Sequence, residues 1–227
     1  MYSFPPLAAA IGGLYTVVTG LTTLLTPALG AFSASAAIIL LTMGVRLLLV
    51  PLARRQTAAD RRRRELAPKL REIQRRHRND PERLRRELHD LYAREGTSPL
   101  AGFGPALAQA PVFIAMYGLF LSTDVGGHTN DLLTHTLFGV PLGARLFEVG
   151  GADLAVFAGL FLLLVLVAVG MWRLAGKRSA ADAPGAAIVR LLPFSMVAVA
   201  AFVPLAAGLY LVATTAWTLA ERTLLLS

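Results

Sequence analysis

The stretch SASAAIILLTMGVRLLLVPL, residues 33–52, decides the fold because it is long enough to cross a bilayer and contains a single charged residue, Arg46. An ionised side chain at the centre of a membrane helix costs about 2.5–3.5 kcal/mol on insertion scales. Such residues commonly face a water-filled cavity or a partner and mark a functional site. The stretch therefore predicts a membrane span that holds a functional cation.

A simpler interpretation of Arg46 is that its long side chain reaches the nearest membrane interface. Arg46 lies about six residues from the end of the span, or about 9 Å along a helix, and arginine can bridge much of that distance. Helical side chains lean toward the helix N-terminus, however, and the charge distribution places the nearer interface on the C-terminal side. We therefore favour a hydrated cavity around Arg46.

The composition is typical of a membrane protein with several spans. Hydrophobic residues make up 55% of the 227 residues, yet the formal net charge is +8, which fits apolar spans joined by basic loops. The absence of cysteine excludes disulfides, thiolate metal sites and a cysteine nucleophile. The four histidines lack metal-ligand spacing, and no phosphate-binding loop, nucleophile elbow or zinc-protease pattern occurs. We expect no metal, no cofactor and no enzyme activity.

Basic residues orient five predicted spans. Residues 54–95 carry fourteen arginines and one lysine, whereas residues 123–152 contain one arginine and the first thirty residues contain no charged side chain. By the positive-inside rule the N-terminus lies outside and the C-terminus in the cytoplasm. The predicted fold is an all-α membrane protein with an interfacial helix outside (1–32), spans at 33–53, 99–122, 153–172, 187–203 and 204–223, a cytoplasmic hairpin (54–98), an outer loop (123–152), a cytoplasmic loop (173–186) and a short cytoplasmic tail (224–227).

The N-terminal apolar stretch, residues 7–25, has three interpretations. Its large apolar residues recur at helical spacing while four threonines fall mainly elsewhere, which favours a helix lying on the outer membrane surface. A sixth span is the second option. A cleaved signal sequence is the third, and it is disfavoured because no lysine or arginine precedes the apolar run. The apolar stripe consists of Leu7, Ile11, Leu14, Val18, Leu21 and Leu25.

The basic segment predicts a helical hairpin. Two narrow apolar stripes are separated by Asn79-Asp80-Pro81, in which Asp80 suits an N-cap and Pro81 suits the first helical position. The stripes consist of Leu66, Leu70 and Ile73, then of Leu84, Leu88 and Leu91.

The hairpin carries 15 basic against 8 acidic residues between positions 54 and 95, and this excess of positive charge favours an anionic partner. Lipid headgroups and ribosomal RNA are both candidates, and a solvated basic stalk that only follows the topology rule is an equally simple alternative. The arginines expected to make such contacts are Arg61, Arg62, Arg63, Arg64, Arg75, Arg76, Arg85 and Arg86.

A series of short motifs, each occurring once, follows a distinctive order along nearly the whole chain, residues 5–223. They are Val45-Arg46-x-x-Leu49-x-Pro51-Leu52 with Gln56, Pro68-Lys69, Asn79-Asp80-Pro81, Leu91-Tyr92, Ser98-Pro99-Leu100-x-Gly102, Pro105, Gln109-x-Pro111, Tyr117, Leu192-Pro193, Pro204 and Leu209-Tyr210. No single motif is diagnostic. Their order and their placement relative to the spans resemble the YidC/Oxa/Alb family of membrane protein insertases.

The resemblance implies a protein that moves hydrophilic tails of nascent membrane proteins across the bilayer. It implies a groove, open to cytoplasm and lipid and lined by the first, second and last spans, that contains Arg46. Partners would be nascent membrane proteins, anionic lipids, and the Sec translocon or the ribosome, with the chain working as a monomer in a bacterial plasma membrane. The further groove candidates are Gln109, Thr42, Thr214 and Thr215.

Several positions depart from the family pattern. Ser98 and Thr215 stand where the family often has asparagine, and the sequence after Arg222 lacks the long basic tail with which some members hold ribosomes. Strong tethering of ribosomes is therefore not expected. The chain resembles the minimal Gram-positive form of the family, and its richness in Ala, Arg, Gly and Leu favours an actinobacterial source.

Two other classes of function also fit parts of the sequence. A small transporter or channel could use Arg46 to bind an anionic solute, although the chain shows no internal repeat of the kind common in transporters. A membrane-anchored protein could bind anionic lipid or nucleic acid through its hairpin, although no aromatic residue interleaves the basic ones before Tyr92.

Overall fold

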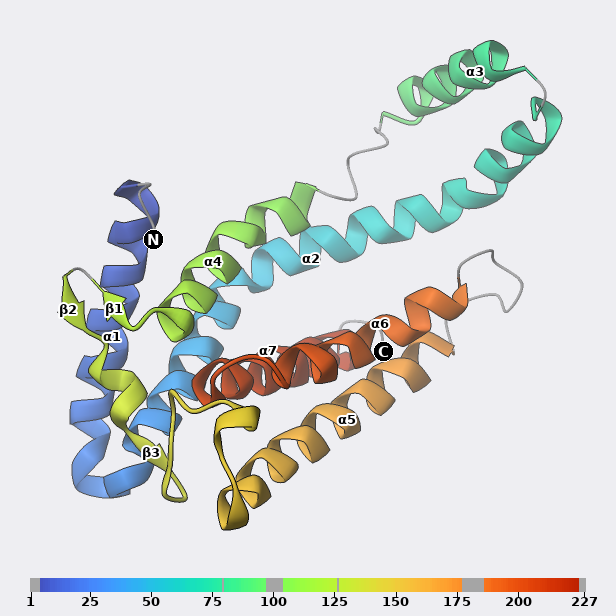
Figure 1. Ribbon diagram of the computed structural model, residues 1–227. Helices are drawn as coiled ribbons and strands as arrows, with labels where there is room; N and C mark the ends of the chain where they lie inside the picture. The colour runs from blue at the N-terminus through green and yellow to red at the C-terminus, as the bar shows by residue number, and fades with distance from the viewer. Residues whose placement is uncertain (1–4, 79, 97–103, 126, 177–185, 225–227) are drawn as a thin grey trace. The chain divides into compact units, whose positions relative to one another are not determined.

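The computed structural model describes residues 5–78, 80–96, 104–125, 127–176 and 186–224, except for the side chains of residues 52–53, 55–64, 104–109 and 186–190 (Figure 1). The chain forms two compact units. The first unit comprises Met1–Leu48 and Val112–Ser227, and the hairpin unit comprises Leu49–Pro111. Helices α2 (Ser33–Arg76) and α4 (Gly104–Leu121) each contribute residues to both units.

The first unit begins with α1 (Pro5–Leu29), which a short 3₁₀ helix, η1 (Gly30–Phe32), joins to α2. Ile11 and Val18 are buried in the core of this unit, and the other members of the predicted N-terminal apolar stripe pack against that core. Several α1 threonines instead hydrogen-bond to their own helix, as Thr16 does to the carbonyl of Gly12. The predicted helix is therefore confirmed, and its apolar stripe packs on the protein core. Its position on the outer membrane surface stays a prediction.

Three further helices complete the first unit: α5 (Leu154–Gly176), α6 (Ala186–Ala200) and α7 (Leu205–Leu224). Helix α5 packs along both α6 and α7 (Figure 1). The break between α6 and α7 falls at residues 201–204, as Pro204 predicts. Helices α5 and α7 approach closely at Gly208, where an added Cβ would lie 2.7 Å from Leu160 Cδ2.

The loop between α4 and α5 contains two small antiparallel hairpins, which the all-α prediction did not include. Strand β1 (Asp124–Val125) pairs with β2 (His128–Thr129), and β3 (Thr136–Leu137) pairs with β4 (Val140–Pro141). The short 3₁₀ helices η2 (Asp131–Thr134), η3 (Leu146–Glu148) and η4 (Gly151–Asp153) complete the loop. These strands are only two residues long, and their pairing depends on turns and on tertiary contacts more than on any alternation of apolar residues.

The loop is bound to the ends of two helices. The buried Asn130 amide donates to the carbonyls of Leu119 and Ser122, at 2.8 and 2.9 Å, and so satisfies acceptors at the C-terminal end of α4. The Leu205 and Ala206 amides at the start of α7 donate to loop carbonyls at 2.9 and 2.8 Å. The loop therefore supplies partners for backbone groups that a helix leaves unpaired at its ends.

The hairpin unit contains the C-terminal part of α2 and all of α3 (Pro81–Arg94). Asp80 is the N-cap of α3, its Oδ1 accepting from the Arg83 amide at 3.0 Å, and Pro81 occupies the first turn. Lys69 Nζ of α2 lies 2.6 Å from Glu95 Oε1, just after α3, which joins the two arms. The predicted break and helix start are confirmed.

Two stretches in the described part of the chain are long and apolar enough to cross a membrane, Pro5–Pro51 and Gly151–Gly176. Ala110–Leu121 and Leu191–Ala200 are shorter apolar helices. A mainly helical chain with two candidate membrane spans is thus confirmed. The five-span arrangement and the orientation of the termini stay predictions.

Candidate functional site

The predicted cation of the first span is half-buried in the first unit and is bound to the last helix. Arg46 Nε donates to Thr214 Oγ1 at 2.8 Å, and Arg46 Nη2 donates to the same oxygen. The Thr214 side chain is buried, with 6% of the residue exposed. A long-range contact therefore joins α2 to α7 through a charge-assisted hydrogen bond, which is among the stronger kinds.

Aromatic side chains close one side of this contact. Tyr210, one turn before Thr214 on the same face of α7, is 5% exposed. The ring centroids of Phe113 and Phe120 from α4 lie 6.1 and 5.9 Å from that of Tyr210. The bond between Arg46 and Thr214 therefore has a cluster of aromatic rings beside it.

A second charged side chain, Glu221, lies two turns beyond Thr214 on the same face of α7 and interacts electrostatically with Arg46. Among the described residues, no carboxylate comes within 4.0 Å of the Arg46 guanidinium. The buried atoms Glu221 Oε1 and Trp217 Nε1 have no hydrogen-bond partner in the described part of the chain. Buried polar atoms without a protein partner are commonly satisfied by water.

The structure separates the four other groove candidates. Among the candidates whose side chains the structure describes, Thr214 is the one that hydrogen-bonds to Arg46. The Thr42 hydroxyl, one turn before Arg46 and 1% exposed, donates to the Ile38 carbonyl at 2.7 Å. The Thr215 hydroxyl likewise donates to the Leu211 carbonyl at 2.6 Å. The side chain of Gln109 lies outside the described residues.

The sequence interpretation did not select Tyr210 or Glu221 as site residues. The available signal was spacing: Tyr210, Thr214 and Glu221 follow one another at four and seven residues, which places them on one helix face. A carboxylate near a buried guanidinium is a feature that only the long-range contact between α2 and α7 reveals.

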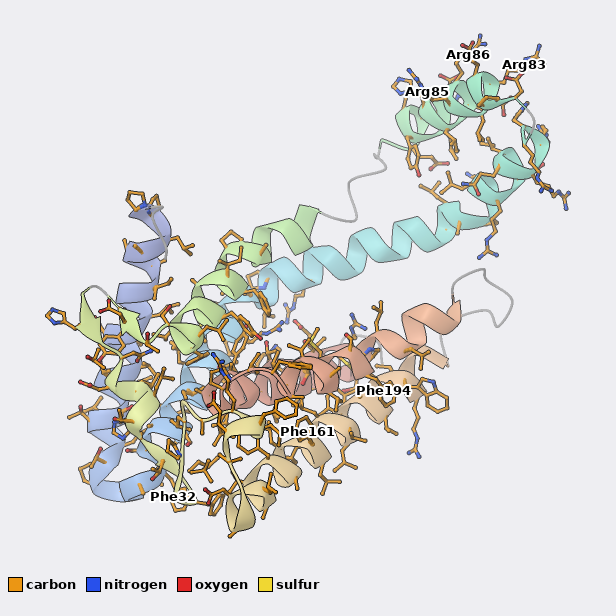
Figure 2. All side chains as sticks on the ribbon, in the orientation of Figure 1. Phe32, Arg83, Arg85, Arg86, Phe161 and Phe194 are labelled. Carbon is orange, nitrogen blue, oxygen red and sulfur yellow. The ribbon has the colours of Figure 1, made fainter. Side chains whose placement is uncertain are left out.

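The predicted basic contact surface lies on the hairpin unit. Arg75, Arg76, Arg85 and Arg86 are exposed, and Figure 2 shows Arg85 and Arg86 projecting outward from α3. Arg76 and Arg86 each also pair with a glutamate four residues earlier, with N–O distances of 2.7 and 3.6 Å. The side chains of Arg61, Arg62, Arg63 and Arg64 lie outside the described residues.

Within the described ranges no cluster of three or more His, Asp or Glu side chains could hold a metal ion. In the first unit the Arg46 guanidinium has Thr214 as its described hydrogen-bond partner. A guanidinium held by one neutral acceptor suits binding of an anionic group.

The comparison with protein families agrees with the order of motifs in the sequence. The family model described as "60Kd inner membrane protein" matches residues 24–227, which include both helices of the Arg46 contact. The chain belongs to this family. This is the YidC/Oxa/Alb family that the order of motifs predicts, because the curated relatives of this chain are named membrane protein insertase YidC.

Three relatives define the extent of the similarity. A membrane protein insertase YidC from Oceanobacillus iheyensis is 35% identical over 134 residues, which cover 56% of this chain and 48% of that protein. Proteins of the same name from Zymomonas mobilis and Streptomyces avermitilis are 39% and 35% identical over 43% and 48% of this chain. The aligned regions span 17% and 27% of those two relatives. The similarity to the Streptomyces protein agrees with the actinobacterial type that the composition favours.

Proposed function

We propose that the chain is a membrane protein insertase that carries hydrophilic segments of nascent membrane proteins across a bacterial plasma membrane. The observation that carries this proposal is the half-buried Arg46 guanidinium bound to Thr214 in a chain of this family. The buried polar atoms of Trp217 and Glu221, which lack protein partners in the described part of the chain, support a hydrated surrounding for that cation.

An insertase must reduce the thickness of hydrocarbon that a polar segment crosses without contact with water. A polar tail that crosses about 30 Å of hydrocarbon loses its hydration, and each unpaired polar group costs several kcal/mol there. A cavity that admits water to half the membrane depth removes much of this barrier. No hydrolysis of a nucleotide is needed, because burial of the client's apolar span in lipid supplies the driving force, at about 25 cal/mol per Å².

Arg46 supplies the electrostatic component. Opposite charges attract more strongly in a low-dielectric cavity than in bulk water, so a half-buried guanidinium draws in an acidic client segment. Thr214 holds the guanidinium through Nε and Nη2 and leaves Nη1 without an acceptor among the described residues. In our proposal the Nη1 group of Arg46 binds the acidic segment of the client, and Gln109 is a further polar residue that lines the groove.

The proposed topology follows the charge distribution. Helices α2, α4, α5, α6 and α7 each cross the membrane, with the N-terminus outside, α1 on the outer surface, and the C-terminus in the cytoplasm. The exposed arginines of the hairpin unit receive clients or anionic lipids on the cytoplasmic side, alone or beside the Sec translocon or a ribosome. The chain acts as a monomer.

Reconstitution tests the proposal. The full chain is placed in proteoliposomes, and protection from added protease measures the insertion of single-span clients with acidic or neutral translocated tails. Arg46→Ala should reduce insertion of the acidic clients several-fold, while Arg46→Lys, which keeps the charge, should retain much of it. Arg173→Ala, which removes an exposed arginine at the end of α5, is the matched control.

Two results would contradict the proposal. The first is insertion of every acidic client by Arg46→Ala at the rate of the parent. The second is uptake of small anions by the same proteoliposomes without any insertion, which would instead favour a transporter.

A further inference from the structure

Glu221, in the last helix, has a carboxylate oxygen that no hydrogen bond within the described chain satisfies. Its Oε1 atom is buried and has no hydrogen-bond partner among the described residues. An ionised carboxylate that is buried without compensation is expensive, and it requires a positive charge or water close by. Two cations act on Glu221, Arg46 of α2 and the adjacent Arg222, and the effect of Arg46 is the larger. Adjacent residues on a helix lie about 100° apart around its axis, whereas Glu221 and the Thr214 that binds Arg46 share one face of α7.

The register of α7 directs Glu221 toward Arg46. Thr214, which Arg46 holds, precedes Glu221 by seven residues, which is two turns and about 10 Å of helix rise. Side chains on a helix lean toward its N-terminus, so Glu221 reaches back along this face toward the guanidinium. The two side chains attract each other electrostatically, but their charged atoms are more than 4.0 Å apart, so they do not form a closed ion pair.

We propose that Glu221 is the internal counter-charge of Arg46, which partly neutralises the guanidinium until an acidic client segment takes its place. The role in client selection rests on the function proposed above. The chemical class of the ligand is a polypeptide segment bearing carboxylates.

An open pair suits this role better than a closed one. A direct bidentate pair between Arg46 and Glu221 would occupy the same donors that a client carboxylate requires. The observed separation leaves Nη1 without an acceptor in the described part of the chain, while the nearby negative charge lowers the local positive potential. A neutral tail gains little at this site, whereas a tail with one or more carboxylates can outcompete a single carboxylate held at a distance. Glu221 thereby raises the charge that a client must carry.

The charge pairing can be measured without any client, because the chain contains no cysteine and a single engineered thiol reports one site. Thr218 is half-buried on the same face, between Thr214 and Glu221, and the described partner of its hydroxyl is the Thr214 carbonyl of its own helix. The full chain carrying Thr218→Cys is placed in proteoliposomes and treated with an anionic or a cationic thiosulfonate reagent of similar size. The ratio of the two rates reports the local potential and cancels differences in accessibility.

Glu221→Gln should raise the ratio of anionic to cationic labelling by roughly threefold or more, since a full negative charge is lost from a partly buried site. Arg46→Gln should lower the ratio, and the double variant should return close to the parent. Glu221→Asp, which keeps the charge, should leave the ratio of anionic to cationic labelling close to that of the parent. Glu148→Gln, in the loop between α4 and α5, is the control for removal of a carboxylate elsewhere in the chain.

A ratio unchanged by Glu221→Gln, or changed no more than by Glu148→Gln, overturns the proposal. This result is distinguishable from a failure of the insertase function, because the labelling requires neither a client nor insertion. Conversely, a normal shift in the ratio with no insertion activity in the assay above supports the charge pairing and rejects the insertase.

Discussion

Arg46 Nε donates to Thr214 Oγ1 at 2.8 Å across a separation of 168 residues, and this bond joins α2 to α7, the last helix of the chain. It fixes a guanidinium that would otherwise have several rotamers available at its depth in the first unit. Ordering the side chain of arginine costs up to about 2 kcal/mol of conformational entropy, which a charge-assisted bond can offset. The bond thus holds a charge in one position before any ligand arrives.

Thr214→Val should destabilise the first unit by about 1–2 kcal/mol, because it removes the acceptor of a charged donor without changing the size of the side chain. Thr215→Val provides the matched control, since the described acceptors of the Thr215 hydroxyl are the Leu211 and Val212 carbonyls of its own helix. Reversible unfolding of the full chain in detergent measures both variants, and Thr214→Ser should recover most of the loss. Equal losses for the two valine variants would show that the contact with Arg46 contributes nothing to stability.

Gly208→Leu should destabilise the packing of α5 on α7 by about 1–3 kcal/mol, because its Cβ would lie 2.7 Å from Leu160 Cδ2. Gly159→Leu, a neighbour on α5 with no atom within 4 Å of its added Cβ, should be close to neutral. Unfolding in detergent again gives the comparison. Leu160→Ala combined with Gly208→Leu should recover part of the stability, and no recovery would mean that Leu160 is not the side chain that fills this space.

Features encoded in adjacent residues were predictable from the sequence. Asp80-Pro81 marks a helix start because a carboxylate accepts from the first amides and proline has no amide to lose, and the structure begins α3 there. The apolar stripe of α1 follows from its periodicity, although its packing against the core of the first unit does not. Arg46 was identifiable as a site residue because an ionised side chain within an apolar span has a high free energy unless it faces water or a partner.

The arrangement around Arg46 could not be read from spacing in the same way. Whether Thr214 or Thr215 meets the guanidinium depends on the rotation of α7 about its axis, and α7 packs extensively against α5. Thr42 and Thr215 satisfy their hydroxyls on their own helices, a choice that is open to any threonine in a helix. The role of Asn130 was missed because its partners lie at the end of another element and have no pattern of their own in the sequence.

Asp80→Ala should weaken the start of α3 by about 0.5–2 kcal/mol, because the Arg83 amide loses its acceptor. A helix of 14 residues is marginal by itself in water, so the loss should appear as faster hydrogen exchange through Pro81–Arg94. Asp90→Ala, which removes an exposed carboxylate in the interior of the same helix, should leave exchange almost unchanged. Equal acceleration in both variants would indicate that net charge, and not the cap, stabilises α3.

Asn130→Ala should release the loop between α4 and α5 from the end of α4. The Asn130 amide is the described donor that satisfies the carbonyls of both Leu119 and Ser122, and Asn130 is only 2% exposed. Each buried acceptor left unpaired costs about 1–3 kcal/mol. Asn130→Asp should be worse than Asn130→Ala, because a carboxylate would then face two carbonyl oxygens and has no hydrogen to donate when ionised.

Limited proteolysis of the full chain in detergent measures the effect, with cleavage within residues 123–153 as the readout. Both Asn130 variants should be cut in this loop several-fold faster than the parent. Thr134→Ala is the matched control, because its exposed hydroxyl bonds only to the nearby Asp131 carbonyl, so its loss leaves the attachment to α4 in place. Cleavage of Asn130→Ala at the rate of Thr134→Ala would mean that the backbone bonds of the loop to α7, from Leu205 and Ala206, hold it without the asparagine.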